Sequence, residues 1–90
     1  MHNKILLASL AMDLKRVALG YNRGSVTMAK RFSEEALRRK KEIYDKDLKP
    51  YMQKLLISLP LVLEEGNKEK LAENAQMYST LIQNYALKFV

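Results

Sequence analysis

The last third of the chain carries apolar residues at alternating intervals of four and three. The residues that share this spacing are Leu71, Ala75, Tyr78, Ile82, Tyr85 and Phe89. Such spacing places side chains on one side of an α-helix, whereas a half-buried strand alternates with a period of two. No stretch of the sequence alternates in that way, and β-branched residues are few. The sequence therefore predicts an all-α protein.

The first twenty residues predict a second helix, which is apolar over most of its circumference. One apolar stripe comprises Leu7, Leu10, Leu14, Val17 and Tyr21, and a second stripe beside it comprises Ile5, Ala8, Met12 and Leu19. The remaining polar strip comprises Ser9, Asp13, Arg16 and Gly20. A helix with this pattern is either central in its bundle or shared with a second chain.

The segment GYNRGSVT interrupts the helical pattern between residues 20 and 27. Gly24 suits the left-handed conformation that follows a helix, and Ser25 or Thr27 could cap the next one. One continuous helix bent near the two glycines is the alternative. A helix from Ser25 to Tyr44 would turn four residues inward, namely Ala29, Phe32, Ala36 and Ile43.

Two prolines and an asparagine mark the boundaries of the remaining helices. Asp47 is expected to cap a helix that has Pro50 in its first turn, and Pro60 is expected to kink or break this helix near Leu59. Gly66 then ends the segment, and Asn67 caps the last helix. Because the connections are short, we predict a single domain over residues 1–90, an antiparallel bundle of about four helices.

The formal net charge of +6 is concentrated in the first part of the chain. Residues 1–54 hold 13 Lys or Arg and 6 Asp or Glu, including four consecutive basic residues at positions 38–41. Consecutive side chains on a helix point around its circumference, so these four do not form one flat patch. Acidic residues precede or follow them by four positions in the pairs Glu34–Arg38, Glu35–Arg39 and Arg38–Glu42, which favours an internally paired, solvated surface.

Arg39 departs from this pattern because it projects along the apolar stripe, between Ala36 and Ile43. An arginine in that position either extends past the edge of the core or meets a carboxylate. We expect its partner to be Glu35 or an acid from another helix or chain.

A basic chain of this kind raises the alternative of non-specific RNA or DNA binding through phosphate contacts. The candidate contacts are Arg23, Lys30, Arg31, Arg38, Lys40 and Lys41. The sequence contains no helix-turn-helix signature, zinc-finger spacing or aromatic RNA-binding motif.

Residues that could perform catalysis are almost absent. The chain has no cysteine and one histidine, His2, and it lacks both an E-x-x-H pair and a glycine-rich phosphate loop. Neighbouring acids such as Glu64 and Glu65 diverge on a helix and do not form a facing acid–base couple. We predict a protein that is not an enzyme and that has no cofactor or metal.

The favoured function is protein–protein interaction by a self-associating bundle, with a dimer preferred. The residues expected at its interface are Leu7, Leu14, Tyr21, Arg39, Tyr78 and Tyr85.

No apolar run is long enough to cross a bilayer, and the N-terminal run continues at helical spacing, unlike a signal sequence. We therefore expect a cytoplasmic protein with no membrane partner.

Overall fold

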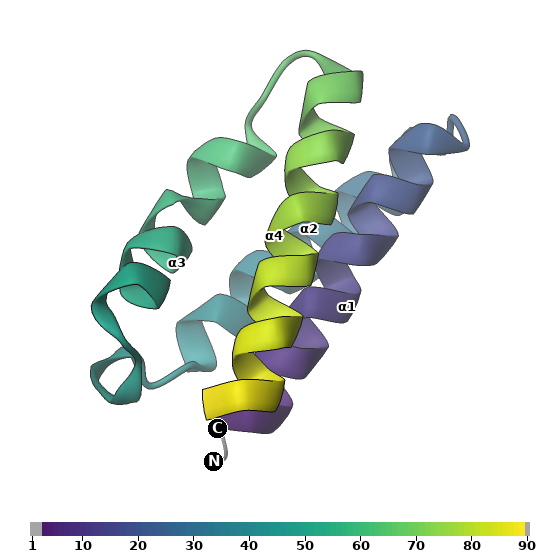
Figure 1. The fold of residues 1–90 in the computed structure, drawn as a ribbon. Helices are drawn as coiled ribbons and strands as arrows, with labels where there is room; N and C mark the ends of the chain where they lie inside the picture. Colours follow the sequence, from purple (N-terminus) through teal and green to yellow (C-terminus); the bar gives the residue numbers. More distant parts are fainter. Residues whose placement is uncertain (1–2, 90) are drawn as a thin grey trace.

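The computed structural model describes residues 3–89 and shows an all-α bundle (Figure 1). Its helices are α1 (Asn3–Asn22), α2 (Val26–Glu42), α3 (Pro50–Leu63) and α4 (Lys68–Phe89), with a 3-10 turn, η1 (Asp45–Asp47), before α3. No strand occurs in the described part of the chain. The predicted fold class is confirmed.

The helices run alternately up and down, so that sequential neighbours are antiparallel (Figure 1). The first turn of α1 and the last turn of α4 lie at the same end of the bundle. Helix α1 packs most extensively against α4 and α2, whereas α3 makes fewer contacts with its two neighbours. Helix α1 is therefore the central element of the bundle. This agrees with the first of the two explanations for its apolar circumference, a central position in the bundle.

The core is built mainly by α1. Its fully buried side chains include Leu7, Leu10 and Leu14, which share a cluster with Met52 and Leu59 of α3 and Ile82 of α4. Val17 is also fully buried and belongs to a second cluster, with Leu71 and Ala75 of α4. Complete burial of one such side chain is worth about 1.5–3 kcal/mol relative to an exposed position. The two apolar stripes of α1 therefore have different environments. The first stripe forms the core, and the second stays at the surface.

The turn between α1 and α2 separates them into two helices. Gly24 has a φ of +77°, the left-handed conformation expected after a helix end. Ser25 occupies the N-cap position, and its N–H donates to the carbonyl of Gly20 at 2.7 Å, although its side chain makes no capping bond. The alternative of one bent helix is wrong.

The start of α3 differs from the prediction. Asp47 does not cap it but belongs to η1, which is closed by a bond from the Leu48 N–H to the Asp45 carbonyl at 3.0 Å. Leu48 is buried, so the chain turns inward before Lys49 takes the N-cap position and Pro50 begins the helix. The boundary moved because burial of Leu48 outweighed the local capping preference of an aspartate.

Two further boundary predictions have different outcomes. Helix α3 continues through Pro60 to Leu63, so the chain is not broken there. Proline removes only one N–H from the ladder, and the rest of the helix remains bonded. Asn67 does cap α4, because its Oδ1 accepts the N–H of Lys70 at 3.0 Å.

Within residues 3–89, no helix has the length and apolar character needed to span a bilayer.

Candidate interaction surface

The structure places most of the predicted interface residues inside a single chain. Leu7, Leu14 and Tyr85 are buried in the core, and Tyr21 and Tyr78 are half-buried against it. Helical spacing identified correctly that these side chains are covered. They are covered by the helices of their own chain, so a surface for a second copy has to be formed by other residues.

The two C-terminal tyrosines connect α4 to α3. The hydroxyl of Tyr85 accepts the backbone N–H of Lys49 at 2.9 Å, and its ring packs edge-on against Tyr51 with centroids 5.7 Å apart. The hydroxyl of Tyr78 lies 2.7 Å from Oγ of Ser58. Both polar groups thus have partners within the chain and hold the peripheral helix α3 in place.

Arg39 is paired with an acid on another helix, as expected. Its Nε–H donates to Oδ2 of Asp13 at 3.0 Å, and a terminal nitrogen lies 3.9 Å from Glu35. Asp13 is only 3% exposed, although the sequence grouped it with a polar strip. Asp13 and Gly20 of that strip face α2 rather than open solvent, since Gly20 also packs against the backbone of Ala29.

A second guanidinium completes the surroundings of Asp13. Arg16 lies 3.9 Å from the other carboxylate oxygen, and its guanidinium stacks over the ring of Phe32 at 5.3 Å from the centroid. A buried carboxylate needs this kind of compensation, since the low dielectric of the interior strongly disfavours an isolated charge. The cluster of Asp13, Arg16, Phe32 and Arg39 therefore fixes α2 on α1.

The four consecutive basic residues point in different directions, which confirms that they form no flat patch. Arg39 turns toward α1, whereas Lys40 and Lys41 line a shallow hollow between α2 and α3, and Arg38 pairs with Glu35. The expected pairs of Arg38 with Glu34 and Glu42 are absent from the ion pairs of residues 3–89. Arg38 reaches the acid three positions before it instead.

The other candidate phosphate contacts are exposed. Lys30 and Arg31 lie on the solvent side of α2, and Arg23 lies in the turn before it. None of the three, nor Lys41, makes an ion pair within the described residues. Glu34 and Glu42 are exposed on the same helix, so its solvent side carries mixed charge.

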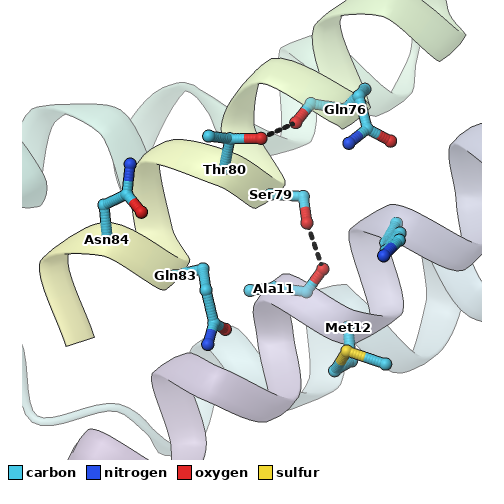
Figure 2. Close-up of a pocket in the computed structure, with 8 residues that line it drawn as sticks. Ala11, Met12, Gln76, Ser79, Thr80, Gln83 and Asn84 are labelled. Carbon is cyan, nitrogen blue, oxygen red and sulfur yellow. Dashed lines mark hydrogen bonds between the residues drawn. The ribbon is translucent and has the colours of Figure 1, made fainter. Parts of the chain in front are cut away.

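A hollow of about 310 Å³ lies between α1 and α4 (Figure 2). Its lining residues are Ala11, Met12, Lys15, Gln76, Ser79, Thr80, Gln83 and Asn84. The hydroxyl of Ser79 donates to the carbonyl of Ala11 at 2.6 Å and joins the two helices, while Thr80 donates to the carbonyl of Gln76 within α4. Lys15 is the only charged side chain in this lining.

The uncharged polar residues of α4, such as Thr80, Gln83 and Asn84, are visible in the sequence, but the sequence gives no sign of which α1 residues complete the hollow. The α1 contribution depends on how the two helices are rotated against each other. The second apolar stripe of α1 was the available signal, since Met12 belongs to it and borders the hollow.

Large apolar side chains remain exposed on α1, α3 and α4. On α4, Met77, Leu81 and Leu87 are 50%, 45% and 66% exposed. Ile5, Met12 and Leu19 of α1 are 60%, 44% and 38% exposed. On α3, Ile57 and Leu61 are 71% and 73% exposed. No charged residue occurs in residues 55–63 of α3 or in residues 74–87 of α4, and the hollow that Met12 borders on α1 includes one charged residue, Lys15.

The described residues contain no group of three or more His, Cys, Asp or Glu side chains that could hold a metal ion. His2 lies outside residues 3–89. The fold and the surface together define a small antiparallel helical bundle with exposed apolar strips. No family model, no curated protein and no solved structure matches this chain.

Proposed function

We propose that this protein is a self-associating helical interaction module without enzymatic activity, and that its working unit is a homodimer. The observation that carries the proposal is the set of large apolar side chains that stay exposed although the bundle core is complete. Single exposed apolar residues are ordinary on a protein surface, whereas groups of them next to an uncharged region are typical of interaction sites.

The distribution of charge also supports self-association. A chain with a net charge of +6 is repelled by a second copy unless contact occurs where charges are few. The central parts of α3 and α4 meet that condition, since neither residues 55–63 nor residues 74–87 include a charged side chain. The solvent side of α2, with its mixed and mainly basic side chains, does not.

Sedimentation velocity on the full chain over a dilution series tests this proposal. We expect a species of twice the 10.4 kDa monomer mass at micromolar concentration, which dissociates on dilution. A single monomeric species across the whole series contradicts the proposed function.

A second candidate function is non-specific nucleic-acid binding by the solvent side of α2. The observation that favours it is that Lys30, Arg31 and Lys41 are exposed and make no ion pair within residues 3–89. Phosphate contacts release counterions, so the affinity should fall steeply as salt is raised.

Fluorescence anisotropy with a random-sequence RNA at two salt concentrations tests this candidate. Lys30→Glu combined with Arg31→Glu should abolish binding. Lys54→Glu combined with Lys68→Glu is the matched control, because it changes the net charge equally on other helices. An equal loss of RNA affinity with both pairs of substitutions would show that binding depends only on net charge and not on the solvent side of α2. Undetectable RNA binding by the unmodified chain at low salt would exclude this function.

A further inference from the structure

The exposed apolar residues of α1 form a straight strip along the bundle. Ile5, Met12 and Leu19 are separated by seven residues each, and seven residues fall only about 20° short of two full turns. At a rise of about 1.5 Å per residue, the strip is about 21 Å long. It therefore covers more than half of the 36 Å length of the molecule.

Helix α4 presents two columns with the same spacing beside this strip. One column is Glu69, Gln76 and Gln83, and the other is Glu73, Thr80 and Leu87. Gln76, Thr80 and Gln83 line the same hollow as Met12, which places both columns on the face that carries the strip (Figure 2). We call this surface the α1–α4 face.

The register of the two helices makes this face self-complementary. The bond between Ser79 and Ala11 sets the middle of α4 beside Met12. Because Ile5 and Leu19 are each seven residues from Met12, they lie at equal distances on either side of it. A two-fold axis that crosses the helices at Met12 brings Ile5 of one copy opposite Leu19 of the other, and Met12 opposite itself.

The same rotation brings unlike charges together at the ends of the face. Glu69 is in the first turn of α4, and Lys4 is in the first turn of α1, so antiparallel packing puts them at opposite ends of one molecule. In an antiparallel pair, the Glu69 end of one copy meets the Lys4 end of the other. A parallel pair would place Glu69 against its own copy and Lys4 against its own copy, which is unfavourable.

We infer that the α1–α4 face binds a second copy of this chain, antiparallel, about a two-fold axis at Met12. This inference rests on the proposed self-association and names the surface that performs it. The molecule measures 36 × 20 × 20 Å, so one whole side of it is comparable to the roughly 800 Å² that each partner contributes to an interface of standard size. An apolar strip bordered by polar side chains, here Lys15, Gln76, Thr80 and Gln83, is also the usual anatomy of such an interface.

Besides the α1 strip, large apolar side chains are exposed on α4, at Met77, Leu81 and Leu87, and on α3, where Ile57 and Leu61 form the competing pair. Ile57 and Leu61 are four residues apart, so they extend over about 6 Å, roughly one helical turn. A contact of that length does not extend along the bundle. We therefore assign Ile57 and Leu61 as the matched control positions.

Cross-linking through single introduced cysteines tests the assignment, because the chain contains no cysteine. Met12→Cys should be joined to itself by a short bismaleimide under native conditions, and Ile57→Cys should not. Ile5→Cys should cross-link with Leu19→Cys in a mixture and not with itself, because an antiparallel pair separates the two copies of Ile5 by about 21 Å. Efficient linkage of Ile5→Cys to itself overturns the antiparallel arrangement.

Charge introduction gives an independent readout. Met12→Glu places two like charges at the axis and should weaken dimerisation at least tenfold in sedimentation, while Ile57→Glu should leave it unchanged. Both positions are exposed in the single chain, and circular dichroism verifies that each variant folds. Dissociation by Ile57→Glu alone overturns the assignment to the α1–α4 face but preserves self-association, whereas an unmodified chain that is monomeric overturns the proposed function itself.

Discussion

Helices α2 and α4 both pack against α1, but they are held there by different interactions. The α1–α2 contact contains a buried ion pair between Asp13 and Arg39 and a close backbone approach at Gly20. The α1–α4 contact is mainly aliphatic, and the one buried side-chain hydrogen bond across it within residues 3–89 runs from Ser79 to the carbonyl of Ala11. One contact is specified by charge and the other by packing.

This difference determines which surface is left over for other molecules. Helix α2 uses part of its charge to bind α1 and exposes the rest, so its outer side remains solvated. Helix α4 has no charged residue between Glu73 and Lys88, and its sides beyond the core remain uncharged. The helix attached by aliphatic packing is thus the one suited to bind another apolar surface.

The largest expected effect is on the charged contact. Arg39→Ala leaves the Asp13 carboxylate buried with only Arg16 nearby, at 3.9 Å, so we expect a loss of about 2–4 kcal/mol in the free energy of unfolding. Arg38→Ala and Lys41→Ala, on the exposed side of the same helix, should each cost less than about 0.5 kcal/mol. Urea denaturation of the three variants measures this.

A double-mutant cycle separates the pair from other consequences of each substitution. Asp13→Asn should partly rescue Arg39→Ala, because it removes the charge that has lost its partner. If Arg39→Ala proves as mild as Arg38→Ala, the ion pair does not fix α2 on α1, and the contrast between the two contacts fails.

The positions of the helices could be predicted from sequence because their signals are local. The four-three spacing of α4, the glycine after α1 and the cap at Asn67 each act within one or two turns. The burial of Asp13 could not be predicted, because it depends on the rotation of α1 against α2. The close approach of Gly20 to Ala29 sets that rotation, and it involves residues in two different helices.

The burial of the predicted interface residues within their own chain has a related cause. Spacing identified Leu7, Leu14 and Tyr85 as covered residues, but it does not distinguish cover by the same chain from cover by a second one. Only the three-dimensional structure shows that the other helices of the same chain cover one side of α1. It also shows that the strip of Ile5, Met12 and Leu19 remains exposed. The strip was visible in the sequence as the second stripe of α1, without any indication that it would remain exposed.

An intermediate effect is expected at the close approach of α1 and α2. A Cβ added at Gly20 would lie 2.9 Å from the backbone nitrogen of Ala29 and 3.0 Å from its Cβ. Separating the helices to admit this methyl group should cost about 1–3 kcal/mol, offset in part by about 1 kcal/mol from the higher helix propensity of alanine. We therefore expect Gly20→Ala to lower the free energy of unfolding by about 0–2 kcal/mol.

Gly66 provides the matched control for this prediction. No atom lies within 4 Å of a Cβ built there, and its φ is not positive, so Gly66→Ala should change stability by less than about 0.5 kcal/mol. If Gly20→Ala is stabilising in thermal melts, the α1–α2 contact is more adaptable than its geometry indicates, and helix propensity dominates at this position.

The smallest effect is expected at the polar link between α1 and α4. Ser79→Ala removes the 2.6 Å bond to the carbonyl of Ala11 and leaves that carbonyl within the hydrogen-bonded ladder of α1. Because no buried acceptor is left without a partner, the loss should be below about 1 kcal/mol, close to the net value of one ordinary hydrogen bond. Thr80→Ala, an exposed hydroxyl that bonds within α4, is the control and should be neutral within error. If instead Ser79→Ala costs as much as Arg39→Ala in urea denaturation, the α1–α4 contact depends on a specific polar interaction too, and aliphatic packing alone does not explain the attachment of α4.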